Sequence, residues 1–320
     1  MKPIASLSLD LDNEWSYLKT HGDLAWQTFP SYLPLVVPRF LDFLARRGLR
    51  ISVFVVGQDA AFERNYEPLR AIAGAGHEIG NHSFHHEPWL HTYSENDIAA
   101  EIDRAAEAIE AATGARPLGF RGPGYSLSRA TLDVLLARGY RYDCTTLPTC
   151  IGPLARAYYF MNAKLSPDER RRRRMLFGSM SEGLRSLRPY AWELGGGKLT
   201  EMPVTTFPLL KVPIHFSYIL ALATISPGLA LGYFRAALGA CRLRRIAPSL
   251  LLHPLDFLDG DEVGSLSFFP AMRMGHARKL ALLDRAFDAF QDLFEVVGVG
   301  EHAAAVAAAA RLRPTVPRFG

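Results

Sequence analysis

The 320-residue chain has few cysteines and almost no net charge, and each shortage excludes a class of protein. Its three cysteines, Cys144, Cys150 and Cys241, lack the CxxC spacing of a zinc ribbon or redox pair, so we expect reduced thiols. The 36 Lys and Arg residues nearly balance the 32 Asp and Glu residues, which leaves a formal charge of +4. A general nucleic-acid-binding protein would be more basic, so no nucleic-acid partner is expected.

Long apolar runs are also missing. The first segment, MKPIASLSLDLDNEW, reaches acidic residues at Asp10 and Asp12 before an apolar run of signal-peptide length can form. The nearly uncharged stretch at 212–233 is broken at Pro227, which leaves two pieces too short to span a bilayer. We therefore expect a cytoplasmic protein.

Short apolar segments alternate with amphipathic segments over the first half of the chain. Residues two apart share a face in 4–11, whereas 33–50 has helical spacing. The expected strands are 4–11, 51–57, 77–80, 117–123 and 140–146, and the expected helices between them are 33–48, with Gly48 as its C-terminal stop, 68–75, 94–113 and 128–138. Repeated βα units predict a mainly parallel sheet, and a barrel closes such a sheet without an exposed edge.

This alternation stops at about 151–247, which we interpret as a basic and apolar helical insertion in a single catalytic domain spanning 1–320. Ser166 and Glu169 form a capping box, so a helix is expected to begin there and to carry the arginine run Arg170–Arg174. The sequence SLLLHPLDF at 249–257 then restores a barrel strand. A helix at 274–294, a short strand and an alanine-rich helix complete the expected fold.

Two pairs of residues have the types and spacing of metal ligands. Asp10 and Asp12 are two apart on a strand, so both point toward the end of the sheet where α/β enzymes build their sites. His82 and His86 are four apart, and one helical turn would bring both imidazoles to one cation. Two nitrogens and one carboxylate suit zinc or a neighbouring first-row metal. Taken singly, the aspartates are equally typical of turn caps, and a lone histidine is typical of a core residue.

Five motifs, taken in order, resemble those of the polysaccharide deacetylase superfamily, also known as NodB-homology or carbohydrate esterase family 4 proteins. These motifs are SLDLD, HSFHH, FRGPGY, YDCTTLP and LLHPLDF. Each motif is weak alone, but the ordered set is specific, and it covers the chain apart from the insertion. The resemblance implies a distorted (β/α)7-type barrel. It also implies a hydrolase that removes an N-acyl group, acetyl in the usual case, from an amino sugar.

The resemblance further implies a role for each motif residue. The divalent metal, zinc first with cobalt, nickel and manganese as alternatives, would be bound by Asp12, His82 and His86. Asp10 would be the general base, oriented and tuned by Arg121. His253 would be the general acid, with its ring held by Asp143. These residue types also fit amide hydrolysis without reference to the family, because a cation and a base activate water while an acid protonates the departing amine.

Departures from the family pattern leave alternatives open. Secreted members carry adjacent aspartates followed by glycine, whereas this chain has Asp-Leu-Asp-Asn-Glu, as in the intracellular Asp-x-Asp branch that resembles allantoinase-like members. Glu14 could therefore join the site, and the division of base and ligand between Asp10 and Asp12 could be reversed. His85 also competes with His86 as the ligand, although the family spacing favours His86.

The substrate is open to several interpretations. Without an export signal, we expect a cytoplasmic nucleotide-linked or lipid-linked amino sugar. The arginine run and the apolar pieces favour peripheral contact with the inner membrane leaflet; the alternative is a solvated arginine face above core helices. Two other functions remain: hydrolysis of a cyclic ureide, as in allantoinase-like relatives, and binding of a membrane or nucleic acid without turnover.

Overall fold

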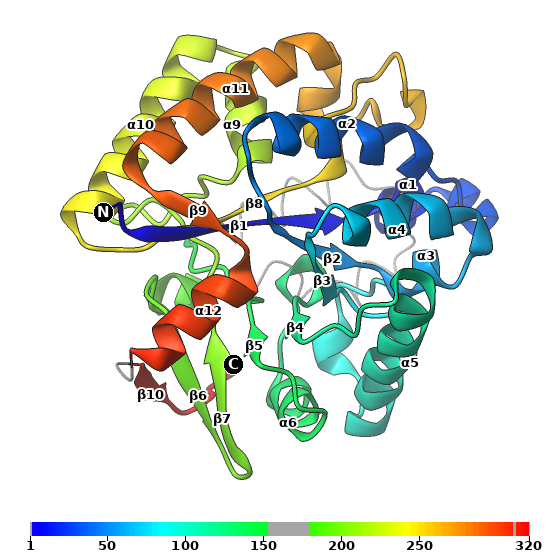
Figure 1. The fold of residues 1–320 in the computed structure, drawn as a ribbon, viewed down its shortest axis with the longest axis vertical. Helices are drawn as coiled ribbons and strands as arrows, with labels where there is room; N and C mark the ends of the chain where they lie inside the picture. The colour runs from blue at the N-terminus through cyan, green and yellow to red at the C-terminus, as the bar shows by residue number, and fades with distance from the viewer. Residues whose placement is uncertain (1, 153–179, 310–311, 320) are drawn as a thin grey trace.

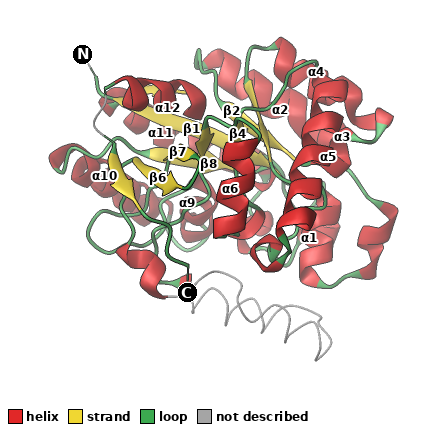
Figure 2. Ribbon diagram, turned by 90° about the horizontal axis from the view of Figure 1, so that it is seen from below, coloured by secondary structure: helices red, strands yellow, loops and turns green. Residues whose placement is uncertain are grey.

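The structure of the chain is a computed structural model that describes residues 2–152, 180–309 and 312–319. The strands are β1 (Ile4–Leu11), β2 (Ser52–Val55), β3 (Glu78–Asn81), β4 (Gly119–Phe120), β5 (Tyr142–Asp143), β6 (Tyr190–Leu194), β7 (Gly197–Glu201), β8 (Ser249–Leu252), β9 (Glu295–Val297) and β10 (Arg313–Thr315). The α-helices described are α1 (Glu14–His21), α2 (Leu33–Arg46), α3 (Gly57–Ala60), α4 (Tyr66–Gly74), α5 (Glu95–Thr113), α6 (Arg129–Ala137), α9 (Phe216–Ala223), α10 (Pro227–Leu243), α11 (His276–Leu293) and α12 (Val299–Ala308). Figures 1 and 2 show the strands at the centre of the molecule with helices around them.

The strands form one mainly parallel sheet that curves into an irregular barrel. Seven of them follow one another in the order β7-β5-β4-β3-β2-β1-β8, and each neighbouring pair is parallel. Just after β7, the backbone N–H of Thr205 donates to the carbonyl of Ser249 in β8, with a nitrogen–oxygen distance of 2.9 Å. This bond joins the two ends of the seven-strand path. The expected distorted (β/α)7-type barrel is therefore confirmed.

Local sequence patterns explain the elements of this barrel. β1 occupies the predicted range 4–11, and all of its residues except the first are buried between the barrel interior and the surrounding helices. α5 begins after Ser94, whose hydroxyl accepts the N–H of Asp97 at 3.2 Å. It ends at Gly114, whose φ of 73° lets the chain leave the helix in a left-handed conformation. Because the barrel strands are parallel, their carboxyl ends share one rim.

The range predicted to be a helical insertion contains part of the sheet. β6 and β7 form an antiparallel pair, and β7 also pairs in parallel with β5, so that Asp143 lies opposite Glu201. The expectation of helix is therefore wrong for the two strands at 190–194 and 197–201. The predicted helix that begins at Ser166, with its run Arg170–Arg174, lies outside the described residues. The division of the chain into a domain and an insertion stays a prediction.

The two apolar pieces of the same range are α9 and α10, and the chain breaks between them before Pro227 as predicted. Their inner faces pack in the hydrophobic core through Phe216, Ile219, Leu220, Phe234 and Leu238. By contrast, Ile225 between the helices is 81% exposed, and Leu229 in the first turn of α10 is 58% exposed. Among the residues that the structure describes, no helix is both long enough and apolar enough to cross a membrane.

Candidate metal centre and active site

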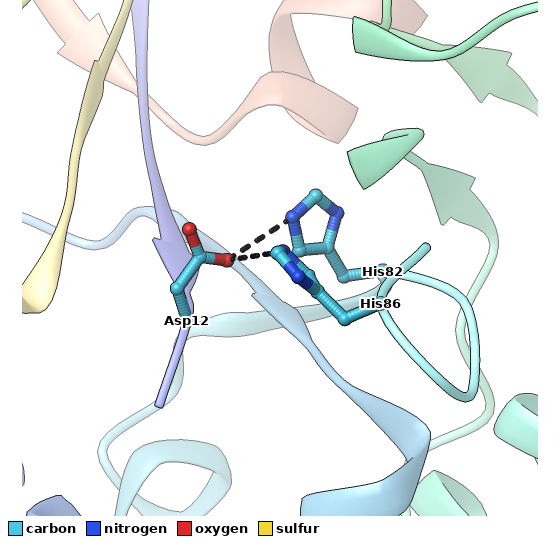
Figure 3. Close-up of side chains that lie close together, drawn as sticks. All are labelled: Asp12, His82 and His86. Atoms are coloured by element: carbon cyan, nitrogen blue, oxygen red, sulfur yellow. Dashed lines mark ion pairs between the residues drawn. The ribbon is translucent and has the colours of Figure 1, made fainter. Parts of the chain in front are cut away.

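Asp12, His82 and His86 meet at the carboxyl-terminal rim of the barrel. Asp12 directly follows β1, whereas the two histidines lie in the loop after β3. Oδ1 of Asp12 is 3.3 Å from Nε2 of His82 and 2.9 Å from Nε2 of His86 (Figure 3). All three side chains are buried, and their ligand atoms are close enough to one another to bind one ion. The structure thus brings together the three residues that sequence analysis assigned to a cation.

An irregular loop, and not a helical turn, brings the two histidines together. Ser83 and His86 both have left-handed backbone conformations, with φ of 59° and 52°. Non-glycine residues rarely adopt this conformation unless their surroundings impose it. The first residues of α3 supply such contacts, because Gly57 N–H donates to Ser83 O at 2.9 Å and Gln58 N–H donates to Phe84 O at 3.0 Å. The expectation of one helical turn is therefore wrong, although the expected proximity is correct.

A buried glutamate on α5 supports the same loop from the other side. Oε2 of Glu101 accepts the backbone N–H groups of Phe84 and His85 at 3.1 and 2.9 Å. The ring of His85 also pairs with Glu101, through Oε1. His85 is therefore directed toward α5 and stands outside the Asp12 cluster, which leaves His86 as the second imidazole of the group. Glu14 is not part of this cluster either; it accepts a hydrogen bond from Ser265 at 2.7 Å.

The protonation pattern of the cluster fits a bound cation. Nδ1 of His82 is 2.6 Å from the carbonyl oxygen of Arg121, and because a carbonyl can only accept, this nitrogen carries the hydrogen. In the neutral ring, the lone pair of Nε2 then faces Asp12, as in metal sites whose ligand histidine donates its other N–H to a carbonyl. Oδ1 of Asp12 and both ring nitrogens of His86 are buried without a hydrogen-bond partner. A divalent ion with a preference for imidazole and carboxylate would satisfy them.

Electrostatics favour the ligand form of the carboxylate. Burial alone would raise the pKa of Asp12, but the imidazoles of His86 and His82 outweigh it and lower the pKa well below its usual range. Burial lowers the pKa of His82, whereas the close contact with Asp12 and the nearby charge of Asp10 raise it, with a net upward shift. Asp12 is therefore an anion at neutral pH, which is the state that a cation requires.

We expect Glu101→Ala to weaken metal binding by about 10-fold to 100-fold, the usual effect of removing a group that orients metal ligands. The substitution leaves two loop N–H groups without an acceptor and frees the left-handed segment before His86 to relax. Competition with a chromophoric chelator would measure the affinity. Glu101→Gln retains an acceptor oxygen and should bind metal nearly as tightly as the wild type. Unchanged affinity in the alanine variant would contradict the supporting role.

Asp10 forms a separate ion pair beside the cluster. Its Oδ1 lies 2.5 Å from Nη1 of Arg121, whose side chain is fully buried. The guanidinium also donates to Ser8 Oγ at 2.8 Å and to Cys144 O at 3.0 Å, and it lies 4.6 Å from the ring centroid of Phe54. Burial would lower the pKa of Arg121, but the adjacent Asp10 charge raises it overall. Asp10 on β1 and Asp12 just after it thus have different partners.

Asp143 lies at the end of β5, but its contacts differ from those predicted. Its Oδ1 accepts a hydrogen bond from Thr145 at 2.5 Å, and its carboxyl group also pairs with that of Glu201. Glu201 in turn accepts the indole N–H of Trp192 at 2.8 Å. In the structure, the ring of His253 pairs with a different residue and not with Asp143 as predicted. Sequence analysis missed Glu201 because its strand lies in the range taken to be helical.

We expect the Asp143–Glu201 pair to make folding stability decrease as pH rises. Burial, and next the neighbouring Asp143 charge, raise the pKa of Glu201 well above its usual value of 4.5, so the folded state retains a proton that the unfolded state releases. The free energy of unfolding should therefore fall with pH above about 4.5, and Glu201→Gln should flatten this slope. Denaturant unfolding at several pH values would measure it. The exposed Glu193 on β6 provides the control, since Glu193→Gln should keep the wild-type slope.

His253 follows β8 at the same rim, but its ring partner is Ser217. Nδ1 of His253 is 2.9 Å from Ser217 Oγ, and its backbone N–H donates to Asp256 at 2.8 Å. His215 lies nearby, with 6.0 Å between the two ring centroids. Ser217 and His215 belong to the apolar stretch that was interpreted as insertion, so the motif order gave no signal for them. The sequence signal for this part of the site was His215, which is a histidine in an otherwise apolar run.

Part of the chain is similar to a known protein family. Residues 18–142 match the family model for polysaccharide deacetylase. The peptidoglycan deacetylase of Helicobacter pylori is 32% identical over 108 residues, which are 33% of this chain and 36% of that protein. The peptidoglycan-N-acetylglucosamine deacetylase of Bacillus cereus is 30% identical over 86 residues, 27% of this chain and 30% of that protein. The chain thus spans about a third of the length of these curated relatives.

A solved structure extends the likeness over the whole fold. A protein of Mycobacterium smegmatis, itself provisionally assigned as a polysaccharide deacetylase, covers 100% of this chain and 95% of its own, with a TM-score of 0.65 and 24% identity. At this level of identity, the similarity between the two proteins shows a shared fold alone. The family match includes the loop of His82 and His86 and the segment of Arg121. Residues 18–142 thus resemble the polysaccharide deacetylase family, and the whole chain shares its fold with the Mycobacterium smegmatis protein.

Proposed function

We propose that this chain is a metal-dependent hydrolase that removes the N-acetyl group of an amino sugar. The observation that carries the proposal is the buried group of Asp12, His82 and His86, with the Asp10–Arg121 ion pair beside it at the rim of a deacetylase-type barrel. Two relatives are named as deacetylases of peptidoglycan, which is a polymer that contains acetylated amino sugars. Both the donor set and the family therefore favour hydrolysis of a sugar acetamide.

The residues divide the reaction between them. Asp12, His82 and His86 would hold the cation, which when bound polarises the amide carbonyl and lowers the pKa of water toward about 7. Asp10 accepts the proton of the attacking water, while Arg121 fixes the orientation of this carboxylate. The water oxygen forms a bond to the acyl carbon.

Departure of the amine is the second half of the reaction. Protonated His253 donates the hydrogen on Nε2 to the amide nitrogen as the carbon–nitrogen bond breaks. The products are acetate and the free amino sugar, and the proton taken up by Asp10 balances the one released by His253. Without such an acid, the leaving group would be an amide anion, which is a very poor leaving group.

Zinc is the proposed metal, with cobalt, nickel and manganese as alternatives, because two imidazoles and one carboxylate suit these ions. Removing the metal with a chelator should abolish amine release, and restoring each ion in turn should rank them by activity. Activity that survives complete metal removal, checked by elemental analysis, would exclude the proposed chemistry.

The proposed substrate is a cytoplasmic amino sugar linked to a lipid or a nucleotide, and the lipid form would place the chain at the inner membrane leaflet. Leu209 and Leu210 are 67% and 64% exposed in the turn before α9, which is the helix that carries Ser217. Ile225 after α9 and Leu229 in the first turn of α10 add exposed apolar surface. Flotation with anionic liposomes tests this arrangement, and replacement of these four side chains by serine should reduce binding if they contact lipid.

A substrate panel tests the proposed function directly. It contains N-acetylglucosamine oligomers, nucleotide-linked and lipid-linked N-acetylglucosamine, and allantoin, each with the zinc-loaded full chain. Amine and acetate should appear in equal amounts from at least one sugar. Turnover of allantoin alone would indicate a cyclic amide hydrolase. No turnover of any member by the metal-loaded chain would contradict the proposed enzyme and favour a binding protein.

A further inference from the structure

The ring of His253 is part of a hydrogen-bonded group built from two separate segments. Ser217, in the first turn of α9, pairs with Nδ1 of His253 at 2.9 Å. Ser217 also hydrogen-bonds the carboxyl group of Asp256, at the end of the short 3₁₀ turn Pro254–Asp256 that follows β8. Asp256 accepts the backbone N–H of His253 at 2.8 Å, which fixes its carboxyl group against the same turn. One hydroxyl group therefore stands between an imidazole and a carboxylate.

The direction of these hydrogen bonds follows from what each group can donate. A carboxylate only accepts, so the single hydrogen of Ser217 Oγ is donated to Asp256. The oxygen of Ser217 is then free to accept from the ring, so Nδ1 of His253 carries a hydrogen. Nε2 is left as the nitrogen available to a substrate. His253 and Ser217 are both only half-buried, so this nitrogen is accessible at the rim.

A buried lysine favours the charged form of Asp256. Lys279, on α11, is fully buried and donates to the carbonyl oxygens of Leu255 and Leu258 at 2.7 and 2.5 Å. Burial raises the pKa of Asp256 overall, and His253, Ser217 and Lys279 each act in the opposite direction and so limit the rise. Lys279 thus provides a compensating positive charge beneath the turn, and Asp256 can serve as an acceptor for Ser217.

We propose that Ser217 is a positioning residue, through which Asp256 keeps a hydrogen on Nδ1 of His253, so that Nε2 is the nitrogen that takes up a proton and passes it to the leaving amine. The catalytic role of Ser217 rests on the proposed function, whereas the position of the hydrogen on the His253 ring does not depend on that function. It gives to Ser217 and Asp256 the role that the family resemblance assigned to Asp143. The arrangement is also independent of the metal loop, because both residues come from the segments around β8 and α9.

Other charged and titratable groups lie around the His253 ring, and the test has to distinguish their effects on activity from the effect of Ser217. His215 packs near His253, and burial lowers the pKa of His215 well below its usual value, with the charges of His253 and Arg121 acting in the same direction. Tyr17 on α1 lies near Asp256 as well as Asp12. A readout on the His253 ring itself is therefore needed, because activity alone would report on all of these groups.

The test compares Ser217→Ala with Ser217→Thr in the zinc-loaded full chain. Ser217→Ala should lower kcat by about 10-fold to 100-fold, which is part of the total effect of general acid catalysis, while KM and bound zinc remain unchanged. Ser217→Thr retains the hydroxyl group and should restore kcat to within about threefold of the wild type. Ser226→Ala is the matched control, since it removes the hydroxyl that caps the neighbouring helix α10 at Leu229, and it should leave kcat unchanged.

Nitrogen NMR of the His253 ring gives a readout that needs no substrate. In the wild type the neutral ring should carry its hydrogen on Nδ1, and in Ser217→Ala the two tautomers should be mixed. A wild-type ring with its hydrogen on Nε2, or an alanine variant with both the wild-type spectrum and the wild-type kcat, would overturn the proposal. If no substrate is turned over but the NMR result is as expected, the proposed function fails while the positioning by Ser217 stands.

Discussion

His82→Ala should give a folded protein that no longer retains zinc and releases amine at least about 1000-fold more slowly. The variant removes one of three converging ligand atoms, and Asp12 and His86 alone offer one oxygen and one nitrogen. Loss of the cation removes several kcal/mol of stabilisation from the transition state, and each 1.36 kcal/mol corresponds to a factor of about ten in rate. Elemental analysis after dialysis would measure bound zinc, and circular dichroism would show that the fold is retained.

The neighbouring histidine provides the control for this experiment. His85 lies in the same loop but pairs with Glu101 and stands outside the Asp12 cluster. His85→Ala should therefore keep close to the wild-type zinc content and activity. Zinc retention by His82→Ala, or an equal loss of zinc from His85→Ala, would show that the ion is bound elsewhere or that the loop binds it through different atoms.

Helices and strands that depend only on the local pattern of residues could be predicted from the sequence. The range 4–11 of β1 was predicted to the residue, because apolar side chains recur at every second position from Ala5 to Leu11. The start of α5 was predicted from the capping residue Ser94. Asp12 and His82 could be assigned to one site because parallel strands deliver their carboxyl ends to a single rim, whatever path the chain takes between them.

Contacts between distant segments could not be predicted in this way. Ser217 is 36 residues from His253, and its hydroxyl lies in a nearly uncharged run that resembles an ordinary core helix. Glu101 is 16 residues from His85 on an amphipathic helix, where a glutamate is expected to face solvent. The left-handed conformations of Ser83 and His86 arise from backbone contacts with α3, and nothing in the spacing of the histidines indicates them.

β6 and β7 were missed for a different reason. Their sequence, YAWELGGGKLTE, does contain a glycine-rich turn between two β-prone segments, which is a hairpin signal. The neighbouring arginine-rich and apolar segments suggested a single helical insertion, and the hairpin was included in it. As a result, Glu201 and its pairing with Asp143 were absent from the predicted site. The partner of His253 was then assigned by family pattern to Asp143, although Ser217 holds the ring in the structure.

His253→Ala should retain its zinc and lower the kcat for an N-acetyl sugar by about 100-fold to 10,000-fold, the usual contribution of a general acid. The variant leaves Asp12, His82 and His86 unchanged but removes the donor for the departing nitrogen. KM should change little, because the proton is transferred in the transition state and not in the bound ground state. Steady-state kinetics of amine release, with elemental analysis of the same sample, would measure both effects.

The leaving group provides the control that separates acid catalysis from a structural effect of His253→Ala. An aryl acetate such as 4-nitrophenyl acetate releases a stable phenolate, which departs without protonation, so its hydrolysis should be nearly equal in the wild type and the variant. A merely distorted site would lose both reactions together. Equal losses on the amide and on the ester would therefore contradict the role of His253. Zinc loss as complete as that of His82→Ala would instead place His253 among the metal ligands, and the acid would have to come from another residue of the rim.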